Sequence, residues 1–173
     1  MKRLLVASFS ILALAACAHT PRGPMAVATL QPISGSTANG AVHFQELADG
    51  SVQVDVDLKG VPAGVHGFHI HDKGSCADNG MAAGGHFNPM AQSHGAPDVM
   101  PHHAGDFGNV TANANGEVHA QFVTKSVTLS AGAASAVGHA VILHANPDDL
   151  VTQPTGNAGG RIACGIVEPS GKM

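Results

Sequence analysis

Histidines are the residues of this 173-residue chain with the clearest chemical potential, and the chain has 12 of them. His69 and His71 stand at positions i and i+2, so on a β-strand their side chains lie on the same face and can bind one ion together. Further ligand-type residues follow along the chain: His86, His94, His103, Asp106 and His144.

Neutral imidazoles suit copper and zinc, and a carboxylate completes a common zinc ligand set. The alternative is a group of surface histidines that bind no metal. The glycine pair at 84 and 85 argues against it, because glycines let a backbone fold closely around a site. We therefore predict a metal site built from these histidines.

Short β-strands are the elements that must position these ligands. The clearest candidate is 52–58, where four apolar residues alternate with Gln53, Asp55 and Asp57, a period of two that places one face on a core. Further strand candidates span 27–33, 41–47, 117–123, 139–144 and 161–167. Turn pairs at Asn39-Gly40, Asp49-Gly50 and Asn115-Gly116 separate some of them, and no stretch shows a sustained helical period. This pattern predicts an all-β antiparallel sandwich or barrel.

Two long segments, 72–105 and 145–160, lack a strand pattern. Long irregular segments in compact domains are usually functional or disordered. The first carries the ligand candidates His86, His94 and His103, which favours function.

Composition supports a single domain with a real core. Apolar residues make up 44 % of the chain and charged residues 12 %, while Trp and Tyr are absent. The core must then consist of Val, Ile, Leu, Ala and Phe. The formal net charge is −4, and it becomes −6 when the two basic residues of 1–16 are removed, so nothing indicates a nucleic-acid surface.

The N-terminus predicts export. Lys2 and Arg3 precede the apolar run 4–16, which is too short to span a bilayer and is typical of a signal peptide. The run ends in Leu14-Ala15-Ala16-Cys17, which resembles the lipobox of bacterial lipoproteins. An ordinary cleaved signal followed by an incidental Cys17 is the alternative.

The lipobox interpretation divides the chain into a signal peptide (1–16), a lipidated tether (17–24) and a folded domain (25–173). It predicts a periplasmic protein attached to a membrane by lipid alone. Ala18 after the lipidated residue favours the outer membrane. Of three cysteines, lipid on Cys17 leaves two, a number that can pair in an oxidising compartment.

Several motifs together resemble the copper/zinc superoxide dismutase family, whose members are β-sandwiches. The matching stretches occur in order across residues 27–167: Gly67-Phe68-His69-Ile70-His71, the run 84–89, His94-Gly95, the run 103–109, the run 138–144 and the run 156–165. The resemblance implies a Greek-key β-sandwich or flattened barrel with two long functional loops.

The resemblance also assigns roles to individual residues. It implies copper ligands at His69, His71, His86 and His144 and zinc ligands at His86, His94, His103 and Asp106, with His86 bridging both ions. It implies that the carboxylate of Asp148 links ligands of the two metals and that Arg161 holds the anionic substrate. It also implies a disulfide between Cys76 and Cys164.

The implied activity is conversion of superoxide to dioxygen and hydrogen peroxide by Cu(II)/Cu(I) cycling, with a structural zinc and with His86 helping to deliver a proton. A copper-buffering protein on the same fold is the main alternative, and a structural adhesion-type sandwich is a second. A storage protein needs neither Arg161 nor a bridging histidine. The sequence leaves monomer and homodimer both open.

Overall fold

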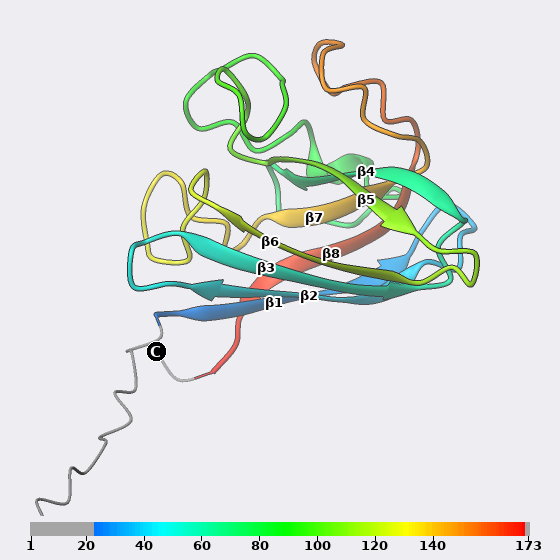
Figure 1. Cartoon of the computed structure of the whole chain (residues 1–173), viewed down its shortest axis with the longest axis horizontal. Helices are drawn as coiled ribbons and strands as arrows, with labels where there is room; N and C mark the ends of the chain where they lie inside the picture. The colour runs from blue at the N-terminus through cyan, green and yellow to red at the C-terminus, as the bar shows by residue number, and fades with distance from the viewer. Residues whose placement is uncertain (1–22, 172–173) are drawn as a thin grey trace, which may run out of the picture.

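A computed structural model describes residues 23–171. Eight antiparallel strands form one sheet in the order β5-β4-β7-β8-β1-β2-β3-β6. Their bounds are β1 (Met25–Pro32), β2 (Asn39–Glu46), β3 (Val52–Lys59), β4 (Gly64–His71), β5 (Asp106–Ala112), β6 (Val118–Thr124), β7 (Ala140–His144) and β8 (Arg161–Pro169). The end strands β5 and β6 contact one another, and the sheet curls into the flattened barrel of Figure 1. The predicted all-β antiparallel fold is confirmed.

Strand β3 shows why the sequence folds this way. Its alternate residues Val52, Val54, Val56 and Leu58 are buried, while the polar residues between them are partly or fully exposed. β2 and β6 pair with β3 in continuous register, so their inward residues enter the same core. Burial of alternate apolar side chains along each strand therefore closes the barrel.

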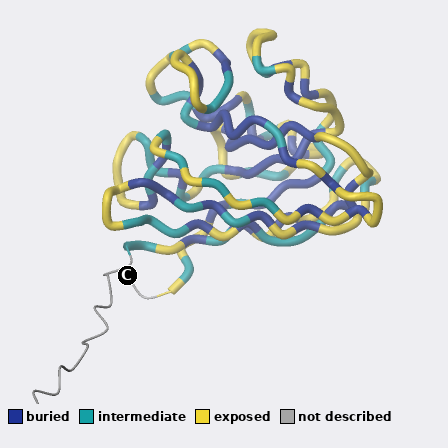
Figure 2. Tube along the Cα trace, viewed as in Figure 1, coloured by how far each residue is buried: buried dark blue, intermediate teal, exposed yellow. Residues whose placement is uncertain are grey.

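Strands β4 and β7 are buried on both faces. Phe68 and Ile70 of β4 belong to the barrel core, yet the residues between and after them, His69 and His71, are also fully buried. All five residues of β7 are buried as well. The outer face of these strands is covered by the segments 72–105 and 145–160, which rise over the barrel in Figures 1 and 2.

These two segments are irregular, as predicted, apart from the 3-10 helix η1 (Met81–Ala83). A disulfide between Cys76 and Cys164, which are 88 residues apart, fastens the first segment to β8. Its sulfurs lie against a small cluster that includes Ala83, Ala140 and Ile142. This pairing is the one that the family resemblance implied.

Three details of the strand prediction differ from the structure. β4 was not among the candidate ranges, although His69 and His71 were considered as neighbours on one face of a strand. β5 was not predicted, because Gly108, at a φ of 73°, and Asn109 interrupt its apolar pattern. Asn39-Gly40 is not a turn but the start of β2, paired with Lys59 and Leu58. A Cβ at position 40 would lie 2.2 Å from the carbonyl oxygen of Asp57, so close strand pairing, and not a turn, explains this glycine.

The predicted signal peptide, most of the tether and Cys17 lie outside the described residues. The described chain begins and ends on the side of the barrel away from the two long segments (Figure 1). Within residues 23–171, no helix is both long and apolar enough to cross a membrane.

Candidate metal centre

Two groups of buried side chains lie between the barrel and the covering segments. The first contains His69 and His71 of β4, His86 of the segment 72–105, and His144 at the end of β7. Each offers one ligand atom, and these atoms all lie within 4.8 Å of one another. This group is the set assigned to copper by the resemblance.

Hydrogen bonds fix which nitrogen atoms of this group can bind a cation. Nδ1 of His71 lies 2.9 Å from the carbonyl oxygen of Gly84, and Nδ1 of His144 lies 3.2 Å from that of Gly159. A carbonyl only accepts, so each Nδ1 carries the proton and each Nε2 keeps a free lone pair. The two Nε2 atoms face each other at 3.2 Å. Two buried lone pairs that face each other at this distance fit a cation bound between them.

The second group contains His86, His94 and His103 with Asp106 at the start of β5. Oδ1 of Asp106 lies 2.7, 3.0 and 3.2 Å from the Nδ1 atoms of His86, His94 and His103. Its Oδ2 accepts hydrogen bonds from the backbone N–H groups of Gly95 and His103. Three imidazoles and a held carboxylate converging on one point are a common zinc ligand set.

His86 belongs to both groups, with Nδ1 toward Asp106 and Nε2 toward the copper set. Five buried side-chain nitrogens in the described chain lack a hydrogen-bond partner. Four of them are ligand atoms of the two groups: His69 Nδ1, His86 Nε2, His94 Nδ1 and His103 Nδ1. Buried polar atoms are rarely left without partners, so these four fit bound metal ions.

Asp148, in the segment 145–160, connects the two groups. Its Oδ2 lies 2.8 Å from Nε2 of His69, and its Oδ1 lies 3.0 Å from Nε2 of His94. Each of these nitrogens therefore donates to the carboxylate, which leaves Nδ1 of both rings free for metal. Gly156 packs directly on this link, because a Cβ there would overlap Oδ1 of Asp148.

Burial keeps the copper-set imidazoles neutral. Desolvation lowers the pKa of His69 to about 4 against the opposing hydrogen bond to Asp148, and it lowers the pKa of His144 to about 3. The pKa of His71 is also lowered by burial. Burial would raise the pKa of Asp106, but the hydrogen bond from His86 and the backbone N–H of His103 hold it below its usual range. Neutral imidazoles and an ionised carboxylate are the ligand forms that metals need.

Arg161 begins β8 beside the copper set. Its guanidinium donates to the carbonyl oxygens of Gly80 and Gly84, the second at 2.6 Å. Gly84 also accepts from Nδ1 of His71, so one carbonyl aligns both side chains. Arg161 is opposite His144 in the β7–β8 register. The structure therefore brings every predicted site residue within 23–171 into one region, and Cys17 lies outside the described residues.

Three supporting residues were not predicted. Asn109 makes two hydrogen bonds to the backbone of Asp148, and Gln153 makes two to the backbone of His94. His66 is buried, with its ring nitrogens 2.8 Å from the carbonyl oxygens of His144 and Pro62. A single sequence carries no signal for such pairings across the fold, although Asn109 lies within one of the family motifs.

Comparison with known proteins agrees with this geometry. The sequence profile described as copper/zinc superoxide dismutase matches residues 38–167. The chain is also similar to a solved structure described as the clock protein EA4, with 36% sequence identity and a TM-score of 0.77. That alignment covers 90% of this chain and 99% of the other.

The family binds copper and zinc, and the two buried groups described above supply a copper-type set of four histidines and a zinc-type set that includes a carboxylate. The match spans β2 to β8, including both covering segments. On the profile match and on the donor sets that it contains, this chain belongs to the copper/zinc superoxide dismutase family.

Proposed function

We propose that this protein is a superoxide dismutase that uses copper at His69, His71, His86 and His144 and zinc at His86, His94, His103 and Asp106. The observation that carries the proposal is that one imidazole, His86, is shared by two complete ligand sets while Arg161 lies beside the copper set. Metal binding alone requires neither feature.

Arg161 supplies attraction for an anion. Burial lowers the pKa of its guanidinium, which nevertheless stays protonated because arginine has a very high intrinsic pKa. Its hydrogen bonds to two carbonyl groups hold the positive charge next to His71. Superoxide is a small anion, and a fixed cation at the site favours its binding.

Copper would supply the one-electron redox chemistry, since nitrogen ligands suit both of its oxidation states. The chain's own contribution is to move a proton. Nε2 of His86 is buried without a hydrogen-bond partner, whereas Nδ1 of the same ring is directed at Asp106. His86 can therefore hold a proton at Nε2, on the side of the copper set, and deliver it to the peroxide product.

The second candidate function is copper buffering on the same fold. It is favoured by the donor sets themselves, which would hold metal whether or not turnover follows. The shared His86 and the aligned Arg161 favour catalysis over buffering.

Metal analysis combined with a superoxide-decay assay tests the choice. We expect one copper and one zinc per chain and rapid, copper-dependent decay. Arg161→Leu should lower the rate by roughly tenfold or more with unchanged copper content, since charge focusing contributes on this scale. Fully loaded protein that leaves superoxide decay at its spontaneous rate would support buffering instead.

We also propose that the protein is exported and anchored by lipid on Cys17, on the strength of the lipobox-like sequence before it. Cys17→Ser should move the protein from the membrane to the soluble fraction without changing dismutation. Wild-type protein recovered entirely in the soluble fraction would contradict the anchor.

A further inference from the structure

A side chain of one covering segment holds the backbone of a zinc-type ligand in the other. The backbone N–H of His94 donates to Oε1 of Gln153, and Nε2 of Gln153 donates to the carbonyl oxygen of His94, each at 2.9 Å. One side-chain amide therefore pairs with both polar groups of a residue 59 positions away, as the backbone of a neighbouring antiparallel strand would. His94 is thus attached to the segment 145–160 through its backbone as well as through its ring.

The other two histidines of the zinc-type set are attached differently. His86 forms an isolated β-bridge with strand β4. The backbone N–H of His103 donates to the side chain of Asp106, at the start of β5. Both are therefore held directly by strands of the barrel. Among the described residues, His94 obtains both hydrogen-bond partners of its backbone from Gln153, so its attachment depends on the other covering segment.

The turn that presents Gln153 is closed by its own backbone. Within 149–156, the N–H of Gly156 donates to the carbonyl oxygen of Thr152 at 2.7 Å, and the carbonyl oxygen of Gly156 accepts from the N–H of residue 149 at 2.8 Å. Part of the entropy cost of ordering the Gln153 side chain is therefore met before it reaches His94.

The barrel fixes the start of the same turn. The side-chain amide of Asn109, on β5, donates to the carbonyl oxygen of Asp148 and accepts from its backbone N–H. A continuous set of hydrogen bonds therefore runs from β5 through Asp148 and the turn to Gln153 and on to His94.

We propose that Gln153 is a positioning residue for zinc, which holds His94 at the ion and slows the release of the ion. The inference rests on the zinc site of the proposed function and requires nothing of the copper set. Loss of a partner that orients a metal ligand typically weakens metal binding 10- to 100-fold. Gln153 is exposed and bonds the backbone of His94 instead of its ring, so the expected effect is at the low end, about tenfold.

Gln153→Met tests this role, because methionine has a similar length but lacks the amide donor and acceptor. Copper- and zinc-loaded protein would be mixed with an excess of chelator, and the rate of zinc release would be measured. Release should be about tenfold faster than from the wild-type protein, in line with the expected loss of affinity. Release at the wild-type rate would overturn the proposal.

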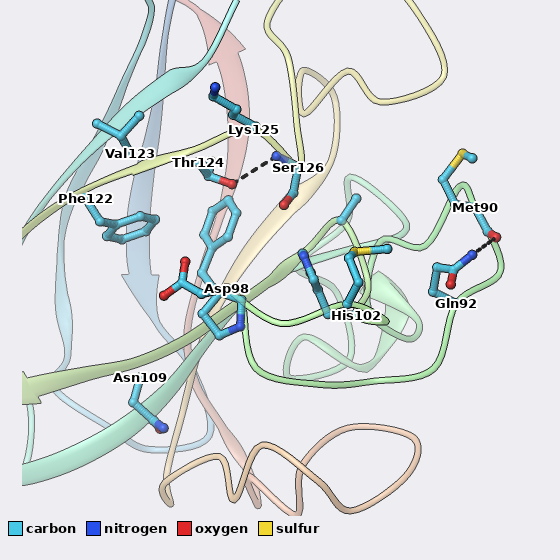
Figure 3. A pocket seen from close by; sticks show the side chains of 14 residues that line it. Met90, Gln92, Asp98, His102, Asn109, Phe122, Val123, Thr124, Lys125 and Ser126 are labelled. Carbon is cyan, nitrogen blue, oxygen red and sulfur yellow. Dashed lines mark hydrogen bonds between the residues drawn. The ribbon is translucent and has the colours of Figure 1, made fainter.

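Gln92→Met is the matched control, since Gln92 lies two positions before His94 in the same segment. Its side-chain amide donates to the carbonyl oxygen of Met90, as Figure 3 shows, and it lines a groove between the segment 72–105 and the strands β5 and β6. The described residues that line this groove include none of 145–160. Zinc release from this variant should match the wild-type rate. Equally fast release from both variants would overturn the proposal.

Two further measurements separate positioning from general stabilisation of the fold. With cobalt(II) in place of zinc, the visible absorption reports the geometry of the ligands, and Gln153→Met should change it while Gln92→Met should not. Equal losses of melting temperature in metal-free and zinc-loaded Gln153→Met, with an unchanged cobalt spectrum, would overturn the proposal, because Gln153 would then only stabilise the fold.

Hydrogen exchange tests the contact in the protein without substitutions. The backbone N–H of His94 should exchange slowly in the zinc-loaded protein, since Gln153 accepts its hydrogen bond. Exchange at the rate of a free amide would overturn the proposal. Wild-type protein that binds no zinc would contradict the proposed function as well, whereas unchanged release rates in Gln153→Met would contradict only the role of Gln153.

Discussion

The two ligand sets are built on different parts of the fold. Three of the four copper-type ligands, His69, His71 and His144, lie on the adjacent strands β4 and β7, which pair in register over residues 68–71. The zinc-type ligands His86, His94 and His103 lie in the segment 72–105, and only Asp106 lies on a strand. The copper-type set is therefore positioned mainly by strands of the barrel, whereas the zinc-type set is positioned mainly by a loop.

On the proposed function, this difference would give the two metals different roles. Strand backbones fix His69 and His71 through hydrogen bonds to neighbouring strands, so the copper-type set can persist without metal. The loop-borne imidazoles depend on Asp106 and on a bound ion to draw them together. If the protein is the proposed dismutase, copper serves activity and zinc serves the structure of the segment.

The largest expected effect is on activity at the strand-based set. His144→Ala should abolish copper-dependent dismutation, because it removes one of two facing Nε2 atoms. The metal-free fold should survive, with the free energy of unfolding changed by about 1 kcal/mol through loss of the hydrogen bond to Gly159. Paired superoxide assays and denaturant titrations would check both. Retained turnover would show that the fourth ligand lies elsewhere.

The complementary change at the loop-based set is His103→Ala. We expect it to lose zinc and to lower the melting temperature of the metal-loaded protein, while some copper-dependent activity remains. A metal present at about 1,000 times its Kd contributes about 4 kcal/mol to stability, which sets the scale of the expected loss. Calorimetry with metal counting measures it. An unchanged melting temperature in zinc-free protein would contradict the division of roles.

Asp148 joins the two sets, so changing it tests whether they act independently. Asp148→Asn removes one of the two acceptor oxygens that orient His69 and His94. Loss of such an orienting partner typically weakens metal binding 10- to 100-fold. Asp149→Asn is a matched control, since Asp149 is exposed and its carboxylate accepts hydrogen bonds only from Val151 and Thr152 in its own turn. Equal metal affinities in the two variants would contradict a linking role.

Acid should lower the stability of the metal-free protein through the histidines of the copper-type set. The pKa values of His69 and His144 are lowered in the folded state to about 4 and about 3, below the ordinary value of 6.5. At pH values between the lowered pKa values and 6.5, the unfolded chain binds protons that the folded chain does not. The free energy of unfolding therefore falls as the pH decreases below about 6.5.

Denaturant titrations of metal-free protein across this range measure the fall. His144→Ala should make the slope shallower, because it removes one of the responsible groups. A stability that is constant from pH 7 to pH 4 would show that these imidazoles are not held neutral.

The same contrast explains how far sequence reasoning reached. His69 and His71 follow from a period of two on a strand. The loop ligands were proposed from their residue types alone, and their division between copper and zinc came from the motif resemblance, because a loop has no periodicity. β5 was not predicted, because Gly108 and Asn109 interrupt its apolar pattern. The side chain of Asn109 hydrogen-bonds to the backbone of Asp148, 39 positions away, and that of Gln153 to the backbone of His94, 59 positions away. Only the folded chain shows such contacts.

The smallest expected effect concerns substrate steering, for which superoxide dismutases are a familiar example. The segment 145–160 has two aspartates and no basic residue. On the other side of the site, the side chain of exposed Lys73 passes within 4.0 Å of the position that a Cβ at Gly84 would occupy. Gly84 is the residue whose carbonyl aligns Arg161 and His71. Among the described residues, Lys73 is therefore the best-placed exposed cation, although Asp72 precedes it.

A field from so few cations should be weak, and salt screens exposed charges over roughly 8–10 Å at physiological ionic strength. We expect the dismutation rate to fall only modestly with added salt. Lys73→Glu should lower the low-salt rate by less than about tenfold, the low end of electrostatic steering, and should change the high-salt rate less. Lys125→Glu is the matched control, because Lys125 lies on the separate groove in Figure 3. Pulse radiolysis across an ionic-strength series measures these rates, and a steep salt dependence that Lys73→Glu leaves untouched would place the steering charge on another residue.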